Sequence, residues 1–161
     1  MDFEERLQKA VERGHRRGLG HREEALARAM GEDELKRLHG QYRLDLSEHI
    51  EKCLQHLLQH FPGFQCETIY GDRGWGAACS RDDFRVEGRG RRHNDYSRLE
   101  MTVRPFNTSH VLELGAKGTI RNKEVFSRTY FEKIEEADPA KFVELVDLWV
   151  LEYAELYAAR T

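Results

Sequence analysis

The apolar residues of this chain change their period at Pro62-Gly63, and this change constrains the fold more than any other feature. Before it, apolar side chains recur every three or four residues over about seven helical turns. They are Leu35, Leu38, Tyr42, Leu46, Ile50, Cys53, Leu57 and Phe61. After it the period falls to two, which is typical of strands. The sequence therefore predicts a long helix that ends at Pro62-Gly63, followed by a sheet.

The strand pattern continues to residue 128 and is interrupted by short polar turns. Its clearest part is residues 96–106, where Leu99, Met101 and Val103 alternate with polar side chains. Consecutive strands with short connections favour an antiparallel meander. The predicted strands are residues 64–70, 75–79, 84–87, 96–106, 111–119 and 124–128. The predicted connections include turns at 80–83, 107–110 and 121–123 and a polar loop at 88–95.

Asp138-Pro139 predicts the start of a second long helix, because Asp suits the N-cap and Pro suits the first helical position. This helix is expected to extend to about residue 158, with an apolar face wider than the roughly 100° that a surface helix buries. The face comprises Phe142, Val143, Leu145, Val146, Leu148, Trp149, Val150, Tyr153, Leu156 and Tyr157. One sheet cannot cover so wide a face, so the remainder is expected to contact another helix or another subunit.

The first 31 residues predict a helical arm with a thin apolar face. Two short helices, 2–13 and 21–30, are expected, and Ala25, Leu26, Ala29 and Met30 form the apolar side of the second. Gly14, Gly18 and Gly20 lie between them, and each glycine disfavours a helix by about 1 kcal/mol relative to Ala, so a break or hinge is expected there.

The expected fold class is therefore α+β. It comprises N-terminal helices, a four- to six-stranded and mostly antiparallel meander sheet, and a C-terminal helix packed on one face of the sheet. Residues 1–31 are predicted to form the arm and residues 32–161 a single α+β domain.

Composition indicates a soluble globular protein, with 39% hydrophobic and 34% charged residues. No apolar stretch approaches the roughly 20 residues that span a bilayer, and the acidic start Met1-Asp2-Phe3-Glu4 does not resemble a secretory signal. The three cysteines are odd in number and lack paired spacing. A cytoplasmic protein with reduced thiols and no membrane partner is expected. The net charge of −3 makes nucleic acid a possible but not a favoured partner.

The predicted long helix carries three histidines and a cysteine along one side, namely His49, Cys53, His56 and His60. Imidazole and thiolate are zinc ligands, and two of them four residues apart on a helix can share one ion. One helix cannot surround an ion with four ligands, so a site built on His49, His56 or His60 would need a ligand from elsewhere, such as His93 or His110. The favoured interpretation instead places Cys53 in the core and the histidines at its wet edge, with no metal or other cofactor.

An arginine-rich segment, Gly-Arg-Gly-Arg-Arg-His-Asn, occupies residues 88–94. Planar guanidinium groups suit phosphate or carboxylate, and neighbouring arginines extend the candidate anion site to Arg89, Arg91, Arg92, Arg98 and Arg104. Nearby acidic residues would neutralise part of this charge, and no aromatic platform of the RNA-binding type accompanies it. The alternative is a solvated hairpin loop.

The sequence contains no nucleophile elbow, paired-acid site or helical zinc signature. The leading hypothesis is thus a non-catalytic protein-interaction domain, adaptor or chaperone-like, that binds itself as a homodimer or binds another protein. One alternative is a binder of a nucleotide, nucleic acid or phosphorylated partner through the arginine-rich loop and the basic sheet. Another is a small enzyme or metal protein that uses the histidine cluster.

Overall fold

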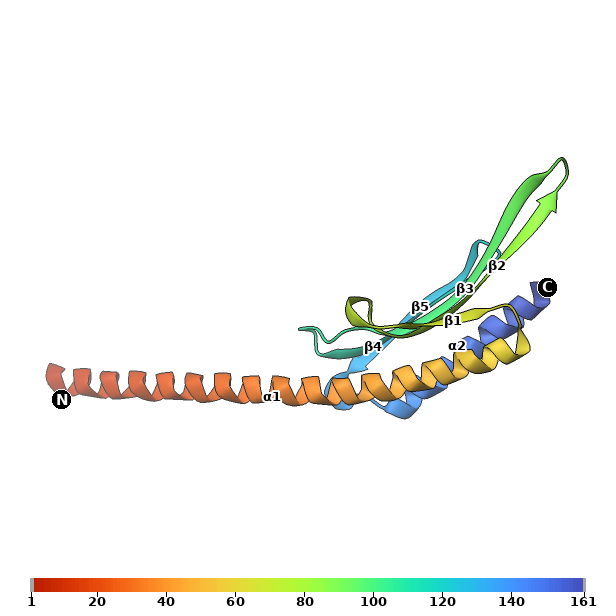
Figure 1. Ribbon diagram of the computed structural model, residues 1–161. Helices are drawn as coiled ribbons and strands as arrows, with labels where there is room; N and C mark the ends of the chain where they lie inside the picture. The colour runs from red at the N-terminus through yellow and green to blue at the C-terminus, as the bar shows by residue number, and fades with distance from the viewer. Residues whose placement is uncertain (1, 161) are drawn as a thin grey trace. The chain divides into compact units, whose positions relative to one another are not determined.

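The computed structural model describes residues 2–160, except for the side chains of residues 27, 29, 30 and 87. Two members of the predicted apolar side of the arm, Ala29 and Met30, thus lie outside the described side chains. The chain divides into two compact units, Met1–Arg37 and Leu38–Thr161, which are described separately. The elements, labelled in Figure 1, are α1 (Phe3–His60), β1 (Gln65–Ile69), η1 (Gly71–Arg73), β2 (Trp75–Glu87), β3 (Arg91–Val103), β4 (Val111–Ile120), β5 (Lys123–Lys133), η2 (Ile134–Glu136) and α2 (Pro139–Arg160).

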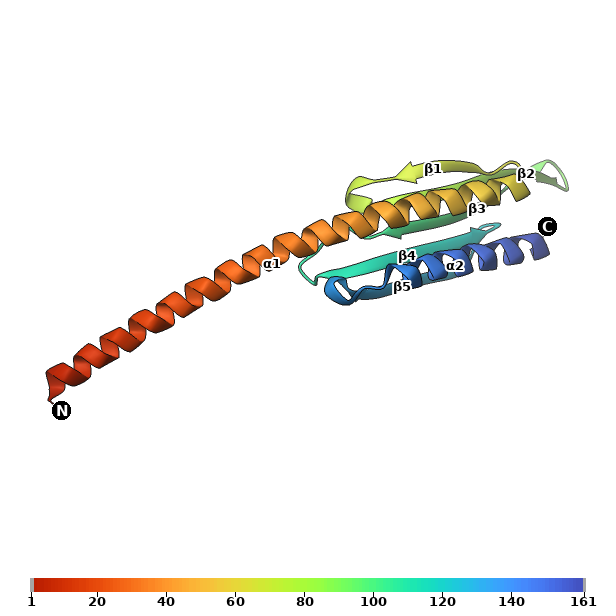
Figure 2. The ribbon, with the colours of Figure 1, turned by 90° about the horizontal axis from the view of Figure 1, so that it is seen from below.

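The second unit confirms the predicted α+β class. Its five strands follow one another across the sheet in the order β1-β2-β3-β4-β5, and every neighbouring pair is antiparallel. The part of α1 that belongs to this unit and α2 lie side by side on one face of the sheet, as Figure 2 shows. Asp138 caps α2 as predicted, since its Oδ1 accepts a hydrogen bond from the Ala140 N–H at 3.1 Å.

The core of the second unit fills the space between the sheet and the two helices. Leu46, Ile50 and Leu54 from α1 and Phe142 and Val146 from α2 are almost completely buried. The inner side of β3 supplies the alternating residues that the sequence pattern identified, namely Leu99, Met101 and Val103. The sequence therefore predicted correctly which side of β3 faces the core.

Two predicted connections in the sheet are wrong. Residues 80–83 are not a turn, because β2 runs without interruption from Trp75 to Glu87 and pairs with β3 throughout. The predicted polar loop 88–95 is reduced to a turn at 88–90, and β3 begins at Arg91. The reason is that backbone pairing continues here through polar residues and then beyond the core, so these strand segments carry no apolar alternation for the sequence to show. Phe84 and Val86, for example, are 75% and 72% exposed.

The predicted break near Gly14, Gly18 and Gly20 is also wrong. A single helix, α1, extends from Phe3 to His60 and joins the two predicted short helices, 2–13 and 21–30, to the predicted long helix. Glycine lowers helix propensity but keeps its backbone N–H, so the ladder of hydrogen bonds can pass through it. Among residues 2–160, neither helix contains an apolar stretch of the length that would cross a bilayer.

Candidate functional site

The junction between α1 and α2 explains how the wide apolar face of α2 is covered. Tyr153 faces the sheet, where its hydroxyl donates a hydrogen bond to the Thr119 carbonyl at 2.8 Å. Tyr157 instead turns toward α1 and the residues that follow it, with ring centroids 4.9 Å from Phe61 and 5.0 Å from Phe64. Coverage is incomplete, because Leu148 and Leu151 remain 51% and 65% exposed.

Three side chains with metal-ligating atoms meet at this junction. His49 and Cys53, one helical turn apart on α1, face Asp147 on α2. The His49 Nε2 lies 2.7 Å from the Asp147 Oδ1, and the Cys53 Sγ lies 3.5 Å from that nitrogen and 3.4 Å from that oxygen. All three residues are partly exposed. Partial burial, reinforced by the negative charge and hydrogen bonding of Asp147, raises the pKa of the Cys53 thiol to about 11. Cys53 is therefore a protonated thiol that donates to the carboxylate.

A shallow groove continues along the two helices from this cluster. His56 and His60 line it together with apolar residues and Glu155. The structure thus separates the predicted histidines, because His49 joins Cys53 and Asp147 while His56 and His60 face the groove. The suggested distant ligands, His93 and His110, are not among the residues that form this cluster.

Asp147 is the member of this cluster that the sequence did not indicate. It flanks the apolar stripe of α2 beside the buried Val146, as His49 flanks that of α1 beside the buried Ile50. Its position at the edge of the stripe was visible in the sequence. Its pairing with His49 depends on which helices are neighbours, which the stripe does not specify.

The five predicted anion-binding arginines do not converge on one site. Arg89 lies in the turn of the β2–β3 hairpin, and Arg91 and Arg92 begin β3. Arg98 and Arg104 lie at and beyond the far part of the same strand, which spans roughly 40 Å at about 3.3 Å per residue.

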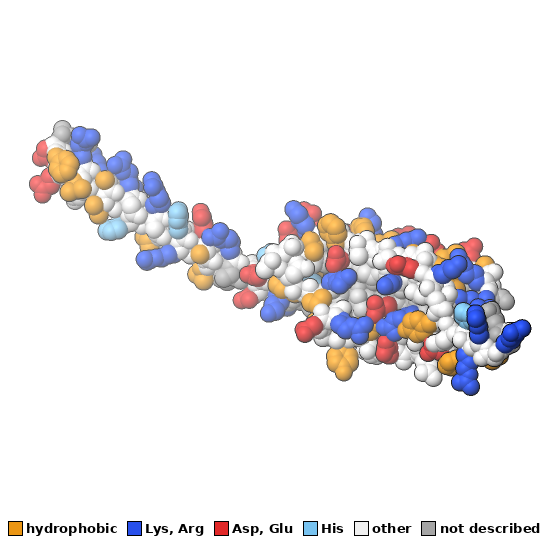
Figure 3. Space-filling view, turned by 90° about the horizontal axis from the view of Figure 1, so that it is seen from above, with side chains coloured by type: hydrophobic (Ala, Val, Ile, Leu, Met, Phe, Trp, Pro, Cys, Tyr) orange, Lys and Arg blue, Asp and Glu red, His pale blue; other side chains and the backbone are white. Residues whose placement is uncertain are grey.

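Two of these arginines already bind carboxylates. Arg98 contacts Glu67 at 2.9 Å and Glu100 at 3.1 Å, and Arg104 lies 3.6 Å from Glu113. Figure 3 shows basic and acidic side chains intermixed over the sheet, with Lys and Arg gathered at the hairpin end. A continuous anion-binding surface would therefore be limited to that end.

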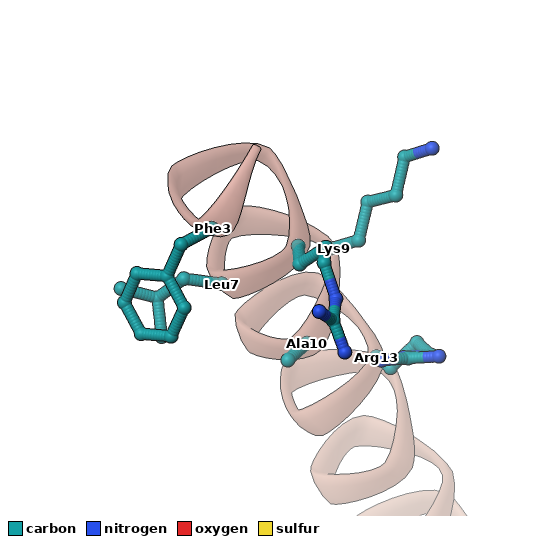
Figure 4. Close-up of a pocket in the computed structure, with 6 residues that line it drawn as sticks. Phe3, Leu7, Lys9, Ala10 and Arg13 are labelled. Atoms are coloured by element: carbon teal, nitrogen blue, oxygen red, sulfur yellow. The ribbon is translucent and has the colours of Figure 1, made fainter. Parts of the chain in front are cut away.

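The first unit presents a different surface, a single helix on which several large apolar side chains are exposed. Phe3, Leu7, Val11, Leu19 and Leu26 are between 49% and 76% exposed. Figure 4 shows Phe3 and Leu7 together on one side of the helix, with Lys9 and Arg13 extending from another side.

Charge is divided along this helix. Residues 6–22 hold six Lys/Arg and one Glu, whereas residues 23–34 hold five Asp/Glu and one Arg. The helix therefore has a basic segment followed by an acidic segment of similar strength.

Comparison with known proteins gives no family for this chain: no family model matches it, and neither a curated protein nor a solved structure does. The function has to be inferred from the described residues alone.

Proposed function

We propose that the protein is a non-catalytic interaction domain, adaptor or chaperone-like, that acts as a homo-oligomer by pairing its N-terminal helix with that of a second copy. The observation that carries this proposal is a set of large apolar side chains exposed to solvent between residues 3 and 26, namely Phe3, Leu7, Val11, Leu19 and Leu26. Helices obtain most of their stability by burying an apolar face, and three glycines make this segment a weak helix by itself. A partner helix would supply the missing burial.

The charge division favours a second copy as that partner, in antiparallel orientation. When two such helices are antiparallel, the basic segment 6–22 of each lies opposite the acidic segment 23–34 of the other. In a parallel pair, like charges would face each other. The antiparallel pair has a twofold axis near Arg22-Glu23, which is the symmetry of a closed, self-complementary dimer. Leu19 of each copy then lies opposite Leu26 of the other, whereas Phe3 and Leu7 lie opposite Tyr42 and Leu38 of the other copy.

The proposed location is the cytoplasm. Cys53, Cys66 and Cys79 are all free thiols, and Cys66 and Cys79 are directly opposite each other on β1 and β2. A reducing compartment would keep such neighbouring thiols in that state.

Sedimentation of the full chain over a concentration series tests the dimer. Two charge-block variants separate the orientations: Arg13 and Arg22 replaced by Glu, and Glu23 and Glu32 replaced by Arg, because an axis near Arg22-Glu23 places Arg13 opposite Glu32 and Arg22 opposite Glu23. Each block should weaken self-association roughly 10- to 100-fold, because several exposed ion pairs of about 0.3–0.5 kcal/mol become repulsive. Combining both blocks should restore association in part, since the opposed segments again differ in sign.

The matched control reverses charge in the second unit, by Glu135→Arg and Glu136→Arg in η2. Both side chains are exposed there, so self-association should not change. A separate variant, Leu19→Ser with Leu26→Ser, tests the apolar contact: it should abolish self-association without reversing any charge. A wild-type chain that stays monomeric at roughly 100 µM would refute the proposal. A combined block variant that associates no better than the single blocks would refute the antiparallel arrangement.

A further inference from the structure

The cluster at the α1–α2 junction has the composition of a transition-metal site. Imidazole nitrogen, thiolate sulfur and carboxylate oxygen are all ligands that zinc accepts, and a three-residue set leaves one position for water or another ligand. This argument does not depend on the dimer proposed above, because all three residues belong to the second unit. We propose that His49, Cys53 and Asp147 bind one divalent transition-metal ion, with zinc the best match.

The separations between the ligand atoms agree with this assignment. Bonds of about 2.3 Å to sulfur and about 2.0–2.1 Å to nitrogen and oxygen, at tetrahedral angles, place sulfur about 3.5 Å from each of the other two atoms. The observed separations are 3.5 Å to His49 and 3.4 Å to Asp147. The nitrogen–oxygen separation would have to widen from 2.7 Å to about 3.3 Å, which replaces their hydrogen bond by two bonds to the metal.

The fold holds the ligands from both sides. Next to them, Ile50 and Leu54 on α1 and Val146 and Trp149 on α2 are buried, so the two helix backbones are fixed by core packing. A spacing of four residues places His49 and Cys53 on the same side of α1. Only small side-chain rotations are then needed, and the ion would join the two helices.

Metal binding has a chemical consequence that can be measured. A cysteine sulfur coordinates a divalent ion as the thiolate, so a bound ion displaces the thiol proton. Each binding event should therefore release a proton, and a bound cobalt ion should show a thiolate-to-metal charge-transfer band. Because the ion would bridge α1 and α2, zinc should also raise the Tm of the protein.

The experiment titrates untagged, chelator-treated full chain with Co²⁺ and then displaces it with Zn²⁺. One ion per chain and a charge-transfer band are expected. The band should be lost in Cys53→Ser, and affinity should fall at least 10-fold in His49→Gln and in Asp147→Asn. His56→Gln is the matched control, since His56 lies about one helical turn beyond Cys53 on α1 but outside the cluster. The metal affinity of this variant should equal that of the wild type.

Circular dichroism of each variant shows whether it folds, and zinc-dependent Tm provides a second readout on the same samples. No charge-transfer band in the wild type would overturn the proposal. Metal binding that persists in a folded Cys53→Ser variant would also overturn it. The same holds if His56→Gln loses metal binding while the His49 and Asp147 variants retain it. If the wild type shows no charge-transfer band, the contact between His49 and Asp147 is a hydrogen bond between the two helices and no metal site.

Discussion

Gly118 of β4 sets how closely α2 can approach the sheet, and replacing it with Ala tests that packing. A Cβ at this position would lie 3.1 Å from Tyr153 Cδ2 and 3.1 Å from Phe126 Cζ. Carbon atoms in favourable contact are about 3.5–4.0 Å apart, so one ring or the strand must shift by several tenths of an ångström. Tyr153 and Phe126 are both buried, so neither ring can move into solvent.

The expected magnitude follows from two opposing effects. Overpacking costs about 1–3 kcal/mol, whereas replacing a strand glycine with Ala recovers roughly 0.5–1 kcal/mol of backbone entropy. Gly118→Ala should therefore lower the free energy of unfolding by about 0.5–2 kcal/mol. Gly115→Ala, on the same strand, is the matched control. Its Cβ would meet its nearest neighbour, Arg104 Nε, at 3.8 Å, so a neutral or slightly stabilising effect is expected.

Urea unfolding followed by circular dichroism measures both variants, provided that the m-value stays constant. A double-mutant cycle identifies the contact responsible. Phe126→Leu removes the ring whose Cζ and Cε1 the added methyl group would meet, so in this background Gly118→Ala should be less destabilising by at least about 0.5 kcal/mol. Equal stabilities for the Gly118 and Gly115 variants would refute the close approach of α2 to the sheet.

Two further predictions concern α1. Replacing Gly14, Gly18 and Gly20 with Ala should increase helical circular dichroism and slow amide exchange in this segment. Each substitution favours helix by about 1 kcal/mol, and no described atom lies within 4 Å of the added Cβ; a weaker helical signal would contradict the continuous helix. The second concerns His39, which is buried and contacts the Arg104 carbonyl at 3.2 Å, and whose pKa burial lowers. Because the unfolded chain then binds this proton at a higher pH than the folded chain, the free energy of unfolding should fall as pH drops below about 6.5 and level off below the folded pKa. His39→Gln should flatten this dependence in urea titrations between pH 7 and pH 5, and an unchanged slope would contradict it.

The candidate sites were predictable only in part. His49 and Cys53 follow from helical spacing, because residues four apart on one helix share a side whatever the rest of the chain does. Asp147 lies 94 residues beyond Cys53, and no local pattern relates them. The arginines illustrate the opposite case, in which nearness in sequence does not become nearness in space. Arg91 and Arg98 are close in sequence, but an extended strand carries them apart and gives Arg98 two acidic partners.

The sequence alone determined the order of elements, the antiparallel meander and the inner side of β3. Period and turn chemistry are local properties, and burial of an apolar face enforces them. Only the tertiary structure decided that residues 80–87 and 91–95 form paired strands, that α1 passes through its glycines, and that α1 lies beside α2. Backbone hydrogen bonds can sustain a strand or helix without an apolar pattern, and the choice of neighbour depends on contacts between residues far apart in the chain. The meeting of His49, Cys53 and Asp147 is a consequence of that choice.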